Sequence, residues 1–285
     1  MFPASFDYHR AGSTQEALDL LARFPDAKLM AGGHSLLPMM KLRLAQPPAV
    51  IDIGRIGELS GIELEGGTIR VGAGSRHAEI AASETLKEHC PILAEAAAHI
   101  GDPQVRNRGT LGGNIAHADP ASDLPAVLVA LDATIDLLGA GGERQVQAGD
   151  FFKGLLSTDL GEGEILTAVH VPFFASGTGT AYLKAEHPAS GYAVCGAAAV
   201  VSLSGGKCTG ASLAFNGVAE TPVSAGAVTA ALVGTSLDDA AIDAAIASHL
   251  SISDPLGDVY ASGEYRVQLA RVYGARALKA ARDRA

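Results

Sequence analysis

The stretch Leu29-Met30-Ala31-Gly32-Gly33-His34-Ser35-Leu36-Leu37-Pro38-Met39-Met40 joins two apolar segments through a pair of glycines. We expect a short strand at Ala27–Met30, and the leucines and methionines from Leu36 to Leu44 have helical spacing. Because glycine has no Cβ, backbone N–H groups here can come close to an anion, and a helix N-terminus adds partial positive charge. Ser35 suits either a helix cap or a hydrogen bond to a phosphate oxygen. The stretch therefore predicts a turn that suits a phosphate group, although a plain turn is the simpler explanation of the local pattern.

A second pair of glycines occurs in Thr110-Leu111-Gly112-Gly113-Asn114, and Asp119 and Asp123 follow it. It lies within residues 101–125, a connection long enough to predict a functional loop. Two such loops suit a dinucleotide, since N–H groups bind a pyrophosphate and a carboxylate accepts from ribose or ribityl hydroxyls. Neither loop has the spacing G-x-G-x-x-G, and no G-x-x-x-x-G-K-[ST] sequence occurs. We therefore expect a dinucleotide-binding fold that is neither a Rossmann nor a P-loop fold.

Apolar patterns around these loops predict strands and helices over the first 171 residues. A hairpin at Gly66-Gly67 is expected within residues 61–71. Helical spacing occurs before the second loop, where Pro91 suits a helix start. The remaining expected strands and helices lie at residues 50–53, 78–89, 92–100, 124–131, 133–138, 144–146 and 165–171.

Residues 172–179 form the expected boundary to a second domain. Beyond it, three strands at residues 181–186, 193–203 and 208–215 predict an antiparallel sheet, followed by alanine-rich helices from about Ser224. The predicted class is α+β, with domains at residues 1–173 and 178–285.

Composition excludes several classes of protein. The chain has 285 residues and a net charge of −10, and it lacks a run of lysine and arginine, so a nucleic-acid partner is not expected. The longest apolar run, Ala193 to Leu203, is broken by Gly196 and is shorter than the roughly 18 residues that span a membrane, so no transmembrane segment is expected. The N-terminus has no signal-peptide pattern, which predicts a cytoplasmic location.

Other chemistry is weakly indicated. Cys90, Cys195 and Cys208 lie far apart, so a four-cysteine iron–sulfur cluster within this chain is excluded, and we expect three buried, unreactive side chains. His34 beside Ser35 lacks the surroundings of a hydrolase triad, and His117 near the two aspartates matches no familiar metal spacing, so we expect no metal site. The segment 102–108 suits either an acidic partner or phosphate groups, or it is a solvated loop.

The first stretch and the sequence from Arg108 to Asp123 resemble the paired FAD loops of molybdenum hydroxylase flavoproteins. Their order, their spacing and the three-strand, helical tail resemble the medium subunit of aerobic carbon monoxide dehydrogenases over essentially the whole chain. Xanthine dehydrogenases have a similar domain within a longer chain. The resemblance implies a two-lobed FAD-binding domain of the vanillyl-alcohol-oxidase-like (PCMH) type, with the lobes dividing near residues 55–60, and a smaller C-terminal α+β domain.

The resemblance also implies which residues hold non-covalent FAD. The pyrophosphate would be bound by Leu29, Met30, Ala31, Gly32, Gly33, His34, Ser35, Leu36, Thr110, Leu111, Gly112, Gly113 and Asn114. Asp119 and Asp123 supply the carboxylates after the second loop, with Asp123 reaching the ribityl or ribose hydroxyls, and Ile100 and Leu166 would pack near the cofactor.

Lys184 matches a family lysine close to the flavin, and Tyr192 matches an aromatic residue beside the isoalloxazine. Many relatives have a basic and an acidic residue before that aromatic, whereas this chain has His187-Pro188-Ala189-Ser190-Gly191. A solvated lysine at a strand end and a packing tyrosine are the alternative interpretations.

The resemblance implies an electron-transfer subunit of an oxidoreductase, with no catalytic residue of its own. A molybdopterin-containing large subunit would oxidise the substrate and a small subunit with [2Fe-2S] clusters would pass electrons to the FAD, in a dimer of heterotrimers. Carbon monoxide is the favoured substrate, beside aldehydes, aromatic compounds and N-heterocycles. The alternatives are a stand-alone flavin-dependent oxidoreductase and a non-enzymatic nucleotide-binding protein.

Overall fold

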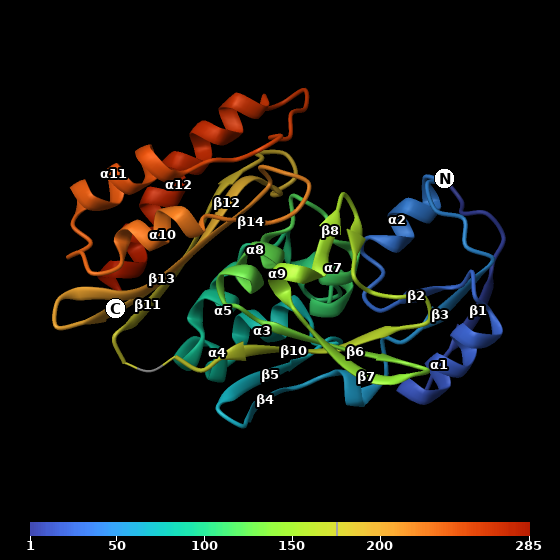
Figure 1. Cartoon of the computed structure of the whole chain (residues 1–285). Helices are drawn as coiled ribbons and strands as arrows, with labels where there is room; N and C mark the ends of the chain where they lie inside the picture. Colours follow the sequence, from blue (N-terminus) through green and yellow to red (C-terminus); the bar gives the residue numbers. More distant parts are fainter. Residues whose placement is uncertain (175) are drawn as a thin grey trace.

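The computed structural model, which describes residues 1–174 and 176–285, contains a small parallel sheet, two larger antiparallel sheets and a two-stranded ribbon (Figure 1). Helices pack against the three larger sheets, which confirms the predicted α+β class. We call residues up to the 3-10 helix Gly57–Leu59 the first lobe, those from there to Phe174 the second lobe, and those from Ser176 onward the C-terminal domain.

The first lobe has strand order β1-β3-β2, and all its strands run parallel. A helix connects each strand to the next, as parallel pairing requires. Ile51, fully buried at the centre of this sheet, packs with Ala17 of the first helix. Along the chain the elements are β1 Asp7–Arg10, α1 Thr14–Arg23, β2 Lys28–Met30, α2 Leu36–Lys41 and β3 Ala49–Asp52.

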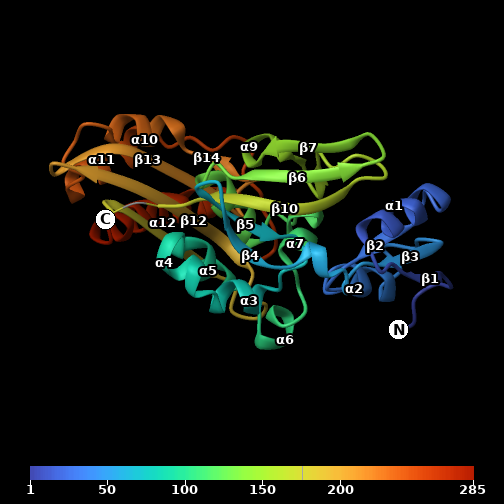
Figure 2. The same cartoon turned by 90° about the horizontal axis from the view of Figure 1, so that it is seen from below.

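The second lobe is built on a five-stranded antiparallel sheet of order β4-β5-β10-β6-β7, seen from below in Figure 2. The expected hairpin at Gly66-Gly67 is confirmed as the β4–β5 pair. The strands are β4 Ile62–Glu65, β5 Thr68–Gly72, β6 Thr134–Gly139, β7 Gly142–Gln147 and β10 Ile165–Pro172. A short helix, α9 Ala148–Phe151, and the ribbon β8 Phe152–Gly154 with β9 Ser157–Thr158 lie between β7 and β10.

Six helices lie between β5 and β6 in the chain: α3 His77–Ala82, α4 Glu84–His89, α5 Pro91–Ala98, α6 Pro103–Arg106, α7 Leu111–His117 and α8 Asp123–Ala130. The single helix expected at residues 78–89 is interrupted at Ser83, which caps α4 by accepting from the Leu86 N–H at 3.3 Å. The prediction of a long loop at residues 101–125 is wrong, because this segment contains α6, α7 and the start of α8. Thr110 caps α7 by accepting from the Gly113 N–H at 3.2 Å, so both glycines lie in the first turn of a helix.

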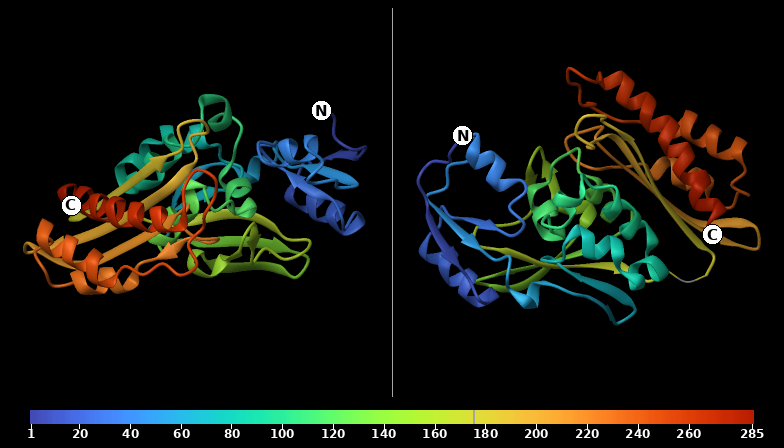
Figure 3. Two further views of the ribbon diagram at one scale, coloured as in Figure 1. Left: turned by 90° about the horizontal axis from the view of Figure 1, so that it is seen from above. Right: turned by 180° about the vertical axis from the view of Figure 1, so that it is seen from behind.

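The C-terminal domain has the three expected long strands, β11 Thr178–Glu186, β12 Ala193–Ser204 and β13 Lys207–Asn216, and a two-residue fourth strand, β14 Val223–Ser224. Figure 3 shows this sheet lying between the red C-terminal helices and the helices of the second lobe. One face packs on α10 Gly226–Leu232, α11 Asp239–His249 and α12 Gly263–Asp283. Through Tyr182, Ala198 and Ala214 the other face joins the hydrophobic core of the second lobe. We propose the domain division 1–173 and 178–285 and a lobe division near residues 55–60, with the two domains sharing this core.

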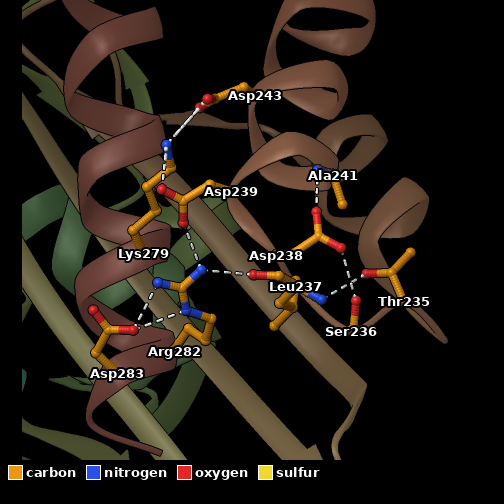
Figure 4. Close-up of polar contacts among 10 residues, drawn as sticks. All are labelled: Thr235, Ser236, Leu237, Asp238, Asp239, Ala241, Asp243, Lys279, Arg282 and Asp283. Carbon is orange, nitrogen blue, oxygen red and sulfur yellow. Dashed lines mark hydrogen bonds and ion pairs between the residues drawn. The ribbon is translucent and has the colours of Figure 1, made fainter.

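Ion pairs hold the two longest C-terminal helices together (Figure 4). Lys279 of α12 contacts Asp243 at 2.9 Å and Asp239 at 3.4 Å on α11. Arg282 donates to Asp239 at 2.7 Å and to the Leu237 carbonyl at 2.9 Å. Because both aspartates are more than half exposed, each pair contributes little, and the apolar contacts beneath them supply most of the stability.

The three cysteines and the apolar character of the helices were both addressed from the sequence. Cys90, Cys195 and Cys208 are buried free thiols, as expected, and burial raises the pKa of Cys90 and of Cys195 to about 12. Among the helices of the described residues, none has both the length and the apolar character needed to cross a lipid bilayer.

Gly196 in β12 provides a test of the packing around the buried Tyr182 hydroxyl in the C-terminal sheet. A Cβ at this position would overlap the Asn216 amide and the Tyr182 hydroxyl, so we expect Gly196→Ala to lower the free energy of unfolding by about 1–3 kcal/mol. Gly210→Ala in β13 is the matched control, because a Cβ there has open space. Urea unfolding of both variants checks this, and equal midpoints would contradict it.

Candidate functional site

The two glycine stretches lie against each other at the junction of the two lobes. A Cβ on Gly32 would overlap the Arg108 carbonyl and lie 2.9 Å from the Gly109 Cα, so only glycine allows this backbone contact. Gly54, after β3, also lies close to the first stretch, because its Cβ would be 2.9 Å from the Ala31 carbonyl oxygen. The expected pairing of the two stretches in space is therefore what the structure has.

The first stretch supplies hydrogen-bond donors. Gly33 has φ +74°, a conformation that favours glycine. Within the described residues, the N–H groups of Gly32, Gly33, His34 and Ser35 have no hydrogen-bond partner. Ser35 occupies the N-cap position of α2 but makes no side-chain capping bond, so its hydroxyl is free for a ligand. Four neighbouring N–H groups and a hydroxyl suit a phosphate.

The second stretch differs, because most of its N–H groups are already used. Leu111 and Gly112 donate to the Ser75 and Ala73 carbonyls at 2.9 and 2.8 Å, and Gly113 donates to Thr110. Gly112 is fixed by packing, since a Cβ would lie 2.6 Å from that of Ala73. Gly113 is exposed, and a Cβ there would contact only the Thr110 hydroxyl. The second stretch therefore offers a flat backbone surface to a ligand rather than a set of donors.

His77, which the sequence analysis missed, lies under the contact between the two stretches. His77 is 3% exposed, and its backbone N–H donates to the Gly109 carbonyl at 3.0 Å. A Cβ on Gly109 would lie 2.8 Å from the imidazole ring of His77. Its Nδ1 is buried and has no hydrogen-bond partner among the described residues. Burial, followed by the nearby His34, lowers the pKa of His77 to about 4. No motif in the sequence marks this histidine.

The segment after the second stretch has its carboxylates turned toward the protein. Asp119 accepts from the Ala121 N–H at 2.9 Å, and the Asn114 side chain accepts from the Ser122 hydroxyl at 2.7 Å. Asp123 is 5% exposed and accepts from the Tyr182 hydroxyl at 2.5 Å and from the Lys184 ammonium at 3.2 Å. Burial raises the pKa of Asp123, which Lys184 and Tyr182 counteract.

Lys184 is buried, with 2% of its side chain exposed, so the interpretation as a solvated strand-end lysine is wrong. Its ammonium donates to the His99 and Gly191 carbonyls, each at 2.8 Å, as well as to Asp123. These three bonds use its three protons. The lysine therefore connects α5, α8 and the turn that precedes Tyr192.

Tyr192 is the half-exposed aromatic residue of this region, with 50% of its surface exposed. Partial burial raises its pKa, and the nearby Asp119 and Asp123 raise it further. The turn before it is closed by a bond from the His187 N–H to the Tyr192 carbonyl at 2.8 Å, and the His187 ring lies 4.3 Å from that of Tyr260. An exposed aromatic face beside buried polar groups suits a planar ligand.

The remaining predicted residues are less accessible. Ile100 and Leu166 are 8% and 5% exposed and lie in the core of the second lobe, so little of either side chain is open to a ligand. Leu29 packs in the core of the first lobe, and Met30 and Leu36 are half-buried beside the first stretch.

Comparison with protein families gives two matches that together span most of the chain. Residues 4–174 match the family described as the FAD binding domain in molybdopterin dehydrogenase. Residues 180–281 match the CO dehydrogenase flavoprotein C-terminal domain. The second match begins at residue 180, within β11.

Individual relatives agree with these matches. The carbon monoxide dehydrogenase medium chain of Afipia carboxidovorans is 42% identical over 100% of this chain and 99% of that protein. The structure of carbon monoxide dehydrogenase from Hydrogenophaga pseudoflava superposes with a TM-score of 0.96 at 44% identity, covering 100% of this chain and 99% of the other. Quinoline 2-oxidoreductase from Pseudomonas putida 86 gives 0.94 at 34% identity, with 99% of each chain covered.

The neutral state of His77 gives a stability prediction. Its pKa is lowered to about 4 in the folded chain, so the unfolded chain binds the extra proton between about pH 6.5 and 4. The contribution of His77 to the free energy of unfolding is therefore complete above pH 6.5, and it decreases by up to about 3 kcal/mol as the pH falls toward 4. In urea unfolding at pH 7.5 and 4.5, His77→Gln should lose less stability than the wild type. The exposed control His249→Gln should match the wild type, and an unchanged pH dependence for His77→Gln would contradict the prediction.

Proposed function

Because this chain belongs to the family of FAD-binding subunits of molybdopterin dehydrogenases, we propose that it binds FAD non-covalently and transfers electrons within a molybdenum-containing hydroxylase. The observation that supports this most directly is the contact of the two glycine stretches at Gly32 and Gly109. It places four unpaired N–H groups beside an exposed, Cβ-free backbone surface, which suits a pyrophosphate.

The residues present fit an extended dinucleotide. Gly32 to Ser35 would hold the pyrophosphate through N–H groups and the Ser35 hydroxyl, and Gly113 would allow it to approach α7. Tyr192 would lie against the isoalloxazine, with Lys184 behind it as a buried cation. When bound, FAD supplies a carrier that takes up two electrons, and the protein supplies binding and orientation. The side chains of the site thus need no nucleophile or acid–base pair.

We further propose that this subunit works beside a molybdopterin-containing large subunit and an iron–sulfur small subunit. The relatives named as medium chains support this, because this chain matches them over their full length. A dimer of heterotrimers is the proposed assembly, and a cytoplasmic location is the proposed place of action. Carbon monoxide is the proposed substrate of the complex, since the relatives at 42% and 43% identity are carbon monoxide dehydrogenase medium chains. The mass of the co-expressed complex in solution tests the assembly, and carbon monoxide oxidation by that complex tests the substrate.

The first experiment is the visible absorption spectrum of the purified full chain, before and after acid release of the chromophore. We expect a flavin spectrum and FAD in the supernatant, with no flavin left on the precipitated protein. A chain that stays colourless with excess FAD and its partner subunits would contradict the proposed function. Bleaching of the single chain by an organic substrate would indicate a stand-alone oxidoreductase.

Gly113→Ala separates binding from folding. Alanine is favoured over glycine within a helix by about 1 kcal/mol, and a Cβ at this exposed position meets only the Thr110 hydroxyl, at 2.9 Å. The Thr110 hydroxyl, which caps α7, must shift to admit this Cβ, and that cost offsets the gain in helix propensity. We therefore expect thermal stability close to that of the wild type but at least about tenfold weaker FAD binding, because the methyl group occupies the surface that faces the pyrophosphate.

Gly226→Ala in α10 is the matched control, since a Cβ there has open space and lies in another domain. Fluorescence titration with FAD measures the affinity of both variants. Wild-type affinity in Gly113→Ala would remove this residue from the site.

A further inference from the structure

Asp123, Tyr182 and Lys184 form a buried, hydrogen-bonded group between the two domains, which we call the Asp123 cluster. Tyr182 is fully buried and donates to one oxygen of Asp123 at 2.5 Å, and Lys184 donates to the other at 3.2 Å. Asp123 begins α8 of the second lobe, whereas the tyrosine and lysine lie two residues apart on β11. Both oxygens of the carboxylate therefore accept a hydrogen bond from a side chain of the C-terminal domain.

The sheet of the C-terminal domain has an opening for this cluster. Gly196 lies opposite Lys184 and Asn216 in the strand register, and a Cβ there would overlap both Asn216 and the Tyr182 hydroxyl. The Asn216 oxygen lies 3.2 Å from that hydroxyl. Ala198 lies opposite Tyr182, so small side chains let α8 approach the sheet. The cluster thus occupies a space that the surrounding sequence keeps open.

The cluster connects to the two segments that flank the exposed tyrosine of the site. Lys184 donates to the His99 carbonyl at the end of α5 and to the Gly191 carbonyl directly before Tyr192. The Ala193 N–H, directly after it, donates to the Ala121 carbonyl at 3.3 Å. The position of Tyr192 is therefore fixed on both sides by contacts that include Lys184 and the segment leading to Asp123.

We propose that Tyr182 is a positioning residue for the flavin end of the FAD site, acting through Asp123 and Lys184 to hold Tyr192 in place. This rests on the proposed function. The tyrosine does not contact the cofactor. Its hydroxyl donates to one oxygen of Asp123, the other oxygen accepts from Lys184, and Lys184 donates to the Gly191 carbonyl.

The cluster has a defined electrostatic environment. Besides Lys184, the titratable groups near Asp123 or Tyr182 are His99 at the end of α5, Cys195 on β12, and Tyr192 and Asp119 at the site. Glu95 accepts from the backbone N–H of Tyr182 and forms an ion pair with Arg284. Burial raises the pKa of Asp123, and the hydrogen bond from Tyr182 lowers it. Removing that hydroxyl therefore raises the pKa further, so the pair with Lys184 is lost at a higher pH as the solution is acidified.

Tyr182→Phe in the full chain tests the proposal, with Tyr273→Phe in α12 as the matched control. We expect the loss of one hydrogen bond to a charged group to weaken FAD binding about tenfold, and FAD release on acidification to reach its midpoint at a higher pH. The control should match the wild type in both. A folded Tyr182→Phe protein with wild-type affinity and a wild-type release midpoint would overturn the proposal, even if its melting temperature falls.

A second variant keeps the test decisive if Tyr182→Phe does not fold. Asp123→Asn combined with Lys184→Met removes both charges together, so neither is left buried alone. We expect FAD release from this variant to follow the acid unfolding of the chain, measured by circular dichroism, at a midpoint below that of the wild type, and an unchanged midpoint would overturn the proposal. A wild-type chain that binds no FAD contradicts the proposed function itself, whereas normal binding with an unaffected Tyr182→Phe variant contradicts only the role of Tyr182.

Discussion

The contact of Gly32 with the Arg108–Gly109 backbone is the constraint on which the site depends. Without a Cβ at residue 32, the turn after β2 reaches the entry of α7, and the first lobe meets the second there. Gly109 leaves room for the buried ring of His77, which supports the same contact from below. A methyl group at either glycine would separate the donors of one stretch from the flat surface of the other.

The two glycine stretches differ in the number of N–H groups that they leave free for a ligand, and their local geometry explains this difference. The first stretch is a turn, so its N–H groups form no sheet or helix hydrogen bonds and stay unpaired. The second begins a helix whose first N–H groups are satisfied by Thr110 and by the loop after β5. A helix start without free donors still serves a ligand where an exposed glycine presents bare backbone, as Gly113 does.

The sequence predicted what depends on local patterns. The β4–β5 hairpin and the long strands of the C-terminal sheet follow from turns and apolar spacing, which act over a few residues. Helix α7 is not predicted from the sequence, because two glycines weaken helix propensity there, although Thr110 before them is a suitable N-cap residue. The partners of Asp123 and the burial of His77 could not be predicted, since Tyr182 lies 59 residues away and no local pattern encodes that pairing.

The buried pair of Asp123 and Lys184 is better explained by its effect on the positions of neighbouring segments than by a contribution to the free energy of unfolding. Moving two charges out of water costs about as much as their attraction returns, so an apolar pair would hold the domains together equally well. An apolar pair would not bind the His99 and Gly191 carbonyls, whereas the lysine ammonium reaches both. Those bonds fix the end of α5 and the turn before Tyr192 relative to each other, which van der Waals packing alone specifies less sharply. The buried charge thus lies where the exposed aromatic face is held at one defined place, next to the segment that follows the second glycine stretch.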